Sequence, residues 1–145
     1  MQSLKSKIKV SNADSNHQPF GNLKSDARAC LDGMGMQVTY TRGDRLFAEG
    51  EWSKCVFFLG SGRIKLTVSS RDGRSVILRI VAAGQVLGLS AALSGNEHEV
   101  TAEAMEPCVV RAVPTKDFLW FVDKYPEAAM EATRCVLREY RSVFS

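Results

Sequence analysis

Few residues in this chain have the types and spacing that chemistry requires. The four cysteines lie far apart in apolar surroundings, and no two of them form a C-x-x-C pair: Cys30, Cys55, Cys108 and Cys135. Structural zinc and iron–sulfur sites need closely spaced cysteines, so we expect no metal and no other cofactor. We interpret all four as buried free thiols of a protein in a reducing compartment.

The two histidines also stand alone. Imidazole is a common metal ligand, but a metal-dependent β-barrel enzyme needs several histidines and a carboxylate around one ion, and the sequence has no H-x-H pair. We expect His17 to be solvated and His98 to be a polar loop residue. Ser61, Ser90 and Ser94 occur in no known nucleophile motif. The sequence predicts no enzyme, and a small β-barrel enzyme is the least favoured alternative.

Charge and hydropathy exclude two classes of partner. The net charge is only +3 over 145 residues and the basic residues are scattered, unlike the clustered patch of a nucleic-acid-binding protein. The longest apolar stretches, such as Val56 to Leu59, are far shorter than the roughly 20 residues of a membrane span. The basic first ten residues are not followed by the apolar segment of a secretory signal. We expect a cytoplasmic, single-domain protein with no membrane contact.

Alternating apolar and polar residues in the middle of the chain predict short, half-buried strands. The clearest runs are Val38 to Tyr40, Ile64 to Val68, Val76 to Ile80 and Val109 to Val113. Glycines in turn-like settings follow one another at intervals of 12, 11, 11 and 11 residues: Gly50, Gly62, Gly73, Gly84 and Gly95. Asp72-Gly73 predicts a hairpin closed by a primed turn, which needs positive φ. Regularly spaced short strands are typical of a sandwich or barrel.

Helices are expected on both sides of this region. Asn22 can cap a helix to Cys30, Thr115 can cap Lys116 to Lys124, and Pro126 can open a helix that runs to Phe144. We divide the chain into a flexible tail (1–19), a β-roll with flanking helices (20–125) and the start of a dimerisation helix (126–145).

Several segments together resemble the catabolite activator protein and FNR family of bacterial transcriptional regulators. They are Thr41 to Gly50, Val56 to Leu66, Asp72 to Arg74, Leu78 to Val81, Gly84 to Gly88, Thr101 to Ala104, Cys108 to Val110, and the helices on either side of Pro126. The resemblance covers about residues 20–145. It implies a mainly β fold, an antiparallel β-roll of the jelly-roll type with flanking helices, and a C-terminal helix that forms a dimer. Family members read DNA through a helix-turn-helix, which we expect to be absent from this chain.

The resemblance also implies a ligand site, and this chain departs from its usual form. The family holds a nucleotide phosphate in a cassette that corresponds here to residues 88–101: Gly88, Leu89, Ser90, Ala91, His98, Glu99, Val100 and Thr101. Gly88 matches the pattern. Leu89 stands at the position of the glutamate that takes the ribose hydroxyl, and the arginine position falls on His98 or Glu99. Neither can supply a permanent forked cation, so tight binding of cyclic AMP or cyclic GMP in the usual mode is not expected.

Three interpretations of the cassette stay open. The pocket can be empty or collapsed, can hold a non-nucleotide effector between apolar walls, or can bind a small anion weakly through Ser90 and the N–H groups after Gly88. We also predict a homodimer through one face of the last helix: Met130, Thr133, Val136, Leu137, Tyr140, Val143 and Phe144. The leading hypothesis is an effector-sensing regulatory domain that reaches DNA only through a module outside this chain. The alternative is a stand-alone dimerisation scaffold with a degenerate pocket.

Overall fold

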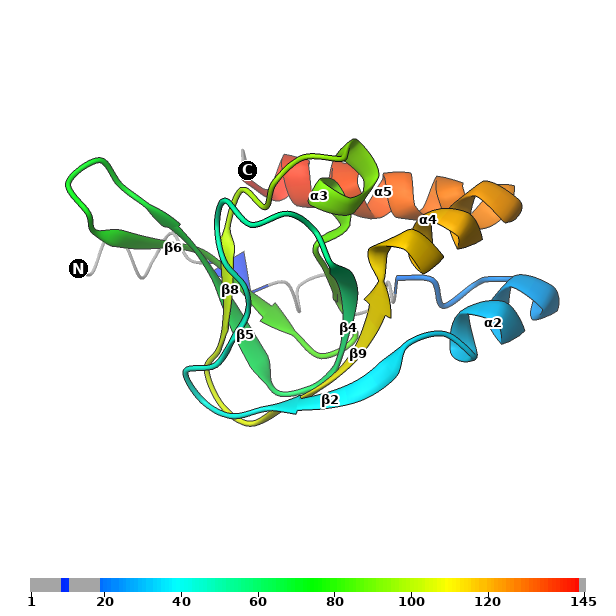
Figure 1. Ribbon diagram of the computed structural model, residues 1–145, viewed down its shortest axis with the longest axis horizontal. Helices are drawn as coiled ribbons and strands as arrows, with labels where there is room; N and C mark the ends of the chain where they lie inside the picture. Colours follow the sequence, from blue (N-terminus) through cyan, green and yellow to red (C-terminus); the bar gives the residue numbers. More distant parts are fainter. Residues whose placement is uncertain (1–8, 11–18, 144–145) are drawn as a thin grey trace.

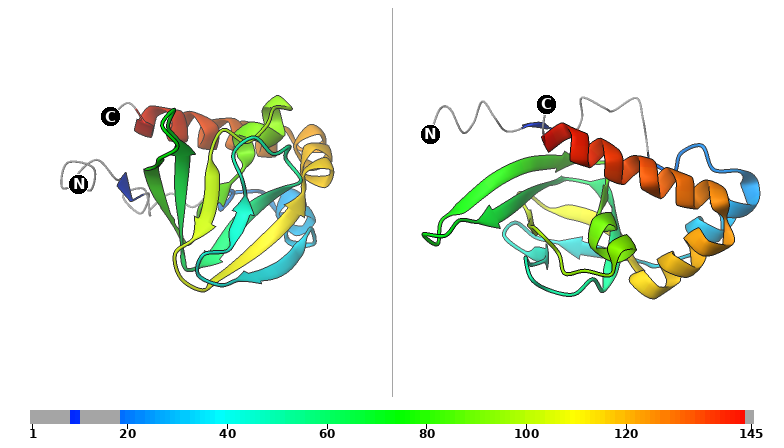
Figure 2. Two further views of the ribbon diagram at one scale, coloured as in Figure 1. Left: turned by 60° about the vertical axis from the view of Figure 1, so that its left-hand side comes forward. Right: turned by 90° about the horizontal axis from the view of Figure 1, so that it is seen from above.

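The computed structural model describes residues 9–10 and 19–143, and it shows two packed antiparallel sheets with helices at one end (Figures 1 and 2). The strands are β1 (Lys9–Val10), β2 (Met36–Tyr40), β3 (Arg45–Phe47), β4 (Cys55–Ser61), β5 (Arg63–Ser69), β6 (Ser75–Ala82), β7 (Val86–Leu87), β8 (Thr101–Ala104) and β9 (Cys108–Pro114). The helices are α2 (Ser25–Asp32), α3 (Leu89–Ser94), α4 (Thr115–Lys124) and α5 (Pro126–Val143).

The strand order is that of a roll. One sheet runs β1-β6-β5-β8-β3 and the other β2-β9-β4-β7, so strands distant in sequence become neighbours. All pairs are antiparallel except β1 with β6, which is parallel. The predicted β-roll is confirmed. Lys9 and Val10 form a short strand within the segment predicted to be a flexible tail, and the rest of residues 1–18 lies outside the described residues.

Strand β4 lies between two apolar clusters, and its burial on both faces accounts for the continuous apolar run from Val56 to Leu59. Phe57 and Leu59 point into the roll, where they pack with residues such as Ile64 and Val110. Val56 lies on the opposite face, in a cluster formed with the helices. A strand covered on both faces has no solvent side and so loses the alternation of a half-buried strand.

The evenly spaced glycines occupy the turns that their spacing predicts. All five have positive φ, from 72° at Gly95 to 94° at Gly84. At Gly62 a Cβ atom would lie 2.6 Å from the Cys108 Sγ atom, so a side chain cannot fit there. The β5–β6 hairpin is confirmed, but its turn is not the primed turn that was predicted. The Gly73 N–H donates to the Ser70 oxygen over 3.0 Å, and Gly73, unlike Asp72, has positive φ.

Two predicted helix caps are wrong. Helix α2 begins at Ser25 rather than after Asn22, and the N–H of Lys24 donates to Glu127 Oε1 on α5 over 2.8 Å. Thr115 is the first residue of α4, and its hydroxyl lies 2.7 Å from that of Ser53 instead of capping the helix. The Lys24 N–H and the Thr115 hydroxyl have partners from distant segments, which local sequence cannot reveal. The prediction that Pro126 opens a long helix is confirmed.

All four cysteines are free thiols, but only two are buried. Cys108 and Cys135 are buried, whereas Cys30 and Cys55 are half-buried. Burial raises the pKa of Cys135 to about 12, so this thiol stays protonated at neutral pH.

Candidate functional site

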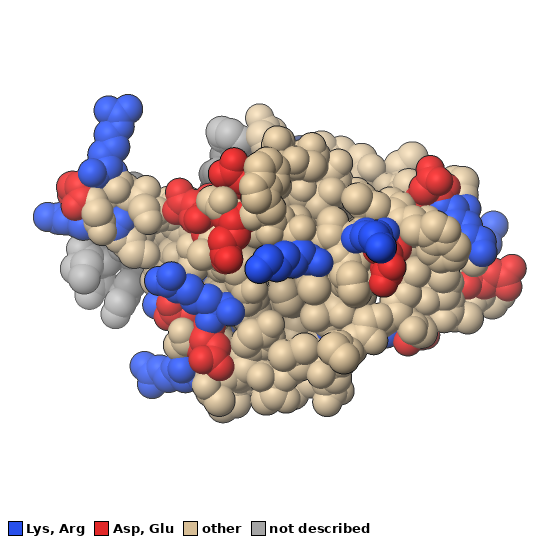
Figure 3. All heavy atoms as spheres, viewed as in Figure 1, with Lys and Arg blue, Asp and Glu red and all other residues tan. Residues whose placement is uncertain are grey.

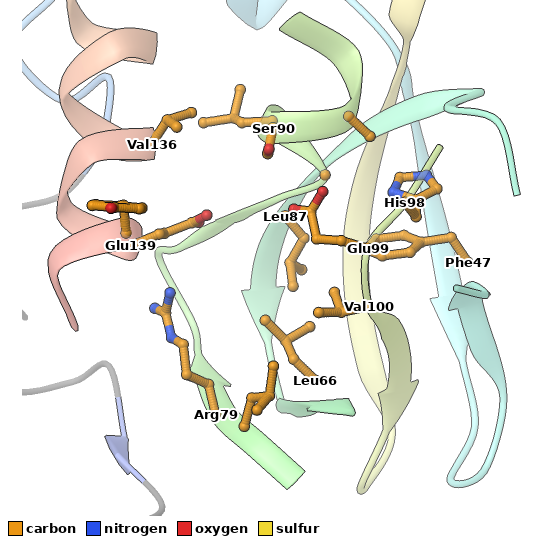
Figure 4. A pocket seen from close by; sticks show the side chains of 15 residues that line it. Phe47, Leu66, Arg79, Leu87, Ser90, His98, Glu99, Val100, Val136 and Glu139 are labelled. Atoms are coloured by element: carbon orange, nitrogen blue, oxygen red, sulfur yellow. The ribbon is translucent and has the colours of Figure 1, made fainter. Parts of the chain in front are cut away.

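A cavity of about 370 Å³ lies between the roll and α5 (Figure 4). Its size falls within the range of about 300–1,000 Å³ that is typical of small-molecule sites. The apolar wall comes from both sheets, α3 and α5: Phe47, Leu66, Leu78, Leu87, Leu89, Ala91, Val100, Val136 and Tyr140. The remaining lining residues supply polar or backbone groups: Arg79, Gly88, Ser90, His98, Glu99 and Glu139.

The roll side of the cavity begins at the turn between β7 and α3. Gly88 has a φ of 85°, and a Cβ atom there would lie 3.3 Å from the Cys55 oxygen, so glycine lets the chain enter α3 against β4. Leu89 and Ala91 are 1% and 2% exposed. Leu89 therefore fills space with an apolar side chain where the family resemblance implies a glutamate that contacts a ligand.

His98 is held firmly inside the fold. Its backbone N–H donates to the Glu51 oxygen and its carbonyl accepts from the Gly50 N–H, each over 2.8 Å. Its ring stacks on Phe47 with centroids 3.8 Å apart. The residue is 4% exposed, and burial lowers its pKa, so the imidazole is neutral at pH 7. His98 lies in a loop, as predicted, but the sequence did not predict that its ring would be buried and stacked on Phe47.

The helix side of the cavity is formed by the second half of α5. Val136, Glu139 and Tyr140 line it, and Glu139 is a partly buried carboxyl. Burial, with a contribution from nearby Glu99, raises the pKa of Glu139 to about 7, while Arg79 and Arg138 oppose that rise. Glu139 is thus a mixture of protonated and ionised forms at neutral pH.

Three charged residues meet at the cavity from three different elements. Figure 4 shows Glu139 reaching from α5, Glu99 from the segment before β8, and Arg79 from β6 below Glu139. Among the residues that the structure describes, none of these three forms a salt bridge within 4.0 Å. The cavity therefore contains two carboxyls and one guanidinium that are not paired with other described residues.

The structure brings together seven of the eight cassette residues proposed from sequence. Gly88, Leu89, Ser90, Ala91, His98, Glu99 and Val100 line the cavity. Thr101 does not, because its hydroxyl accepts a hydrogen bond from the Glu49 N–H over 2.9 Å. Sequence reasoning missed Arg79 and Glu139. A signal for Glu139 was present, since it follows Cys135 by four positions and Val136 by three, on an otherwise inward-facing row.

Some residues of the predicted dimer face are exposed on α5, and another lines the cavity instead. Met130, Leu137 and Tyr140 are 52%, 54% and 62% exposed, and Thr133 is exposed as well. Val136 is half-buried and faces the cavity instead. The side chain of Val143 is not described, and Phe144 lies outside the described residues.

The outer surface carries mixed charge. On the face drawn in Figure 3, basic and acidic side chains are interspersed, in keeping with the net charge of +3. No helix within the described ranges is both long and apolar enough to cross a membrane. Among these residues there is also no group of three or more His, Cys, Asp or Glu side chains placed to hold a metal ion.

The fold and the cavity together define a class of protein, the β-roll domain whose C-terminal helix lies over a cavity. The chain belongs to the cyclic nucleotide-binding domain family, whose model matches residues 37–125. The CRP-like cAMP-activated global transcriptional regulator of Mycobacterium tuberculosis is 29% identical over 125 residues, which are 84% of this chain and 54% of that protein. The cyclic AMP receptor protein of Thermus thermophilus is 22% identical over 102 residues, 70% of this chain and 47% of that protein.

Solved structures show the same fold. The catabolite activator protein of Thermus thermophilus superposes with a TM-score of 0.76 at 21% identity, over 86% of this chain and 59% of that one. The N-terminal domain of a transcriptional regulator from Streptomyces coelicolor has a TM-score of 0.69 at 27% identity, over 86% and 87%. The chain therefore spans about half the length of the two curated regulators and most of the isolated N-terminal domain.

Proposed function

We propose that this chain is the effector-sensing domain of a CRP/FNR-type transcriptional regulator, with an effector that is not a cyclic nucleotide bound in the usual mode. One observation carries the proposal: the cavity is walled by the cassette on one side and by α5 on the other. An occupant would touch both elements at once. A ligand that contacts two elements favours the arrangement in which both contacts are made, and so shifts their equilibrium.

The chemistry of the cassette argues against a cyclic nucleotide. Leu89 is apolar, His98 is buried and neutral, and Glu99 would repel a phosphate. Each lost charge-assisted hydrogen bond weakens binding by about 1.5–3 kcal/mol, and about 1.4 kcal/mol is a factor of ten in affinity. Arg79 enters from β6, outside the cassette, and the carboxyl of Glu139 competes for its charge.

Helix α5 offers a route from the cavity to a second protomer. Tyr140 lines the cavity, yet it is also 62% exposed next to Leu137. An occupant that moves Tyr140 would change the surface on which a homodimer forms. In a longer protein this change would reorient a DNA-binding module outside this chain. Such a regulator works in the cytoplasm, and the proposal assigns no catalytic step to the cavity.

The test is a thermal-shift screen of cyclic nucleotides, small anions and metabolites against a matched pair of variants. Leu78 and Leu93 are both 38% exposed, but only Leu78 lines the cavity. A ligand of the folded state raises the melting temperature, so a true effector should stabilise the wild type and Leu93→Trp but not Leu78→Trp. Cyclic AMP should give no calorimetric binding at micromolar concentration.

Two results would count against the proposal. A micromolar cyclic AMP isotherm would show that the departures in the cassette do not exclude the usual ligand. If no compound stabilises the wild type, the alternative of a dimerisation scaffold without a ligand is favoured. The exposed apolar face of α5 is the observation that supports this alternative.

A further inference from the structure

The charges inside the cavity do not suit an anion. Glu99 and Glu139 together carry more negative charge than Arg79 can balance when both are ionised. Arg79 is also attracted to Glu139, so its charge is partly used within the protein. Glu99 lines the cavity although it is itself exposed, so an anionic ligand would lie near this carboxylate, and near that of Glu139 when it is ionised, and like charges repel at short range.

A cationic ligand would be attracted by the same two carboxyl groups. Figure 4 shows the carboxyl groups of Glu99 and Glu139 directed into the space between the cassette and α5, with the Ser90 hydroxyl above them. An ammonium group has three donors and no acceptor, and these three side chains offer only oxygen atoms. Phe47, Leu66, Leu78 and Val100 supply the wall for an apolar body.

We infer that the cavity selects an apolar organic cation, such as an aryl or alkyl amine, whose ammonium group lies between Glu99 and Glu139. The inference rests on the proposed sensing function and names the chemical class of its effector. One contact comes from the cassette and the other from α5. The charged end of the ligand therefore joins the two elements that the cavity separates.

Because the pKa of Glu139 is about 7, the binding of an amine to the cavity should depend on pH. The charged groups that act on Glu139 are Arg79 from β6, Glu99 from the segment before β8 and Arg138 from α5 itself. His98 and Tyr140 are the other titratable residues that line the cavity. Raising the pH from 6 to 8 ionises more of Glu139, while an alkylammonium with a pKa near 10 stays charged. Burial lowers the pKa of His98, which disfavours its charged form. Amine binding should strengthen over this interval, and anion binding should weaken.

Three indole probes of similar size and shape differ in the charge of their end group. Tryptamine carries an ammonium, tryptophol a hydroxyl and indole-3-propionate a carboxylate on the same indole frame. At pH 8, calorimetry should show tryptamine binding at least about tenfold more tightly than indole-3-propionate. Glu139→Gln and Glu99→Gln should each weaken tryptamine binding by about 3- to 30-fold. Glu139→Gln should also abolish the increase between pH 6 and pH 8.

Glu97→Gln is the matched control, since Glu97 is exposed in the same segment but does not line the cavity, and it should bind tryptamine as the wild type does. Equal or tighter binding of indole-3-propionate, or no effect of Glu99→Gln and Glu139→Gln on tryptamine binding, would overturn the inference.

If no indole probe binds but the screen finds an effector blocked by Leu78→Trp, the ligand class is wrong and the sensing function stands. If neither experiment finds a ligand, both proposals are overturned.

Discussion

The two halves of α5 differ in what lies beneath them. In the first half, Ala128, Ala132 and Cys135 are 0%, 0% and 5% exposed within the cluster that includes Phe118 and Phe121. Hydrogen bonds of 2.8 Å join its Glu127 and Glu131 to the backbone of Lys24 and Phe20. In the second half, Val136, Glu139 and Tyr140 lie over the cavity. The helix is anchored at one end and spans a space that a ligand can fill at the other.

This contrast explains how a small ligand could act on a long helix. Packed interiors resist displacement because their side chains interlock, so the anchored half serves as a fixed point. The half above the cavity carries exposed side chains such as Leu137 and Tyr140, and the pKa of its Glu139 carboxyl is about 7, so this group is partly ionised at neutral pH. We expect ligand and pH to act on the second half, and core substitutions to act on the first.

The largest effect is expected from Phe118→Ala, which removes a fully buried ring of α4 from the cluster that anchors the first half of α5. Deleting a buried aromatic side chain costs about 3–5 kcal/mol, so the midpoint of urea denaturation should fall strongly. Trp120→Ala is the matched control on the same helix, because Trp120 is 51% exposed, and we expect it to cost less than about 1 kcal/mol. Similar losses for both variants would mean that α4 does not anchor α5 as described.

A smaller effect is expected from Glu139→Gln, and it should depend on pH. Because its pKa is raised in the folded protein, Glu139 binds more protons folded than unfolded between pH 4.5 and about 7. Its contribution to the free energy of unfolding therefore falls as the pH rises through that window, by at most about 3 kcal/mol. The variant should match the wild type near pH 5 and exceed it at pH 8. A constant difference at both pH values would contradict a raised pKa.

The smallest effect on the fold itself is expected from Leu137→Glu, on the exposed face of the second half. If this face forms the dimer, a buried charge should weaken association by about 2 kcal/mol or more, with little change in monomer stability. Sedimentation velocity measures the mass, and Leu119→Glu on α4, at a residue that is 38% exposed, is the control. An unchanged mass for Leu137→Glu would place the interface elsewhere.

Much of the roll could be predicted from sequence, because its signals are local. Alternation at Val38 and Tyr40 and positive φ at the spaced glycines both follow from strand geometry. Seven of the eight cassette residues that the resemblance implied line the cavity. Thr101 was the exception, because its hydroxyl is taken up by the backbone of Glu49, 52 residues earlier.

The charged half of the site could not be predicted, because it depends on how distant elements dock. Arg79 appeared as the polar residue of an alternating strand, yet it lies at the cavity beside α5. His98 gave no sign that Phe47 would cover its ring. Glu139 could be assigned to an inward-facing row, but only the docked helix shows that Arg79 and Glu99 are its neighbours.

The central claim is that an occupant of the cavity contacts the second half of α5. Amide hydrogen exchange with and without saturating tryptamine at pH 8 tests it directly. We predict slower exchange in residues 136–143 and in the segment around Glu99, with residues 126–135 unchanged. No change, or a change equal along the whole helix, would contradict the account.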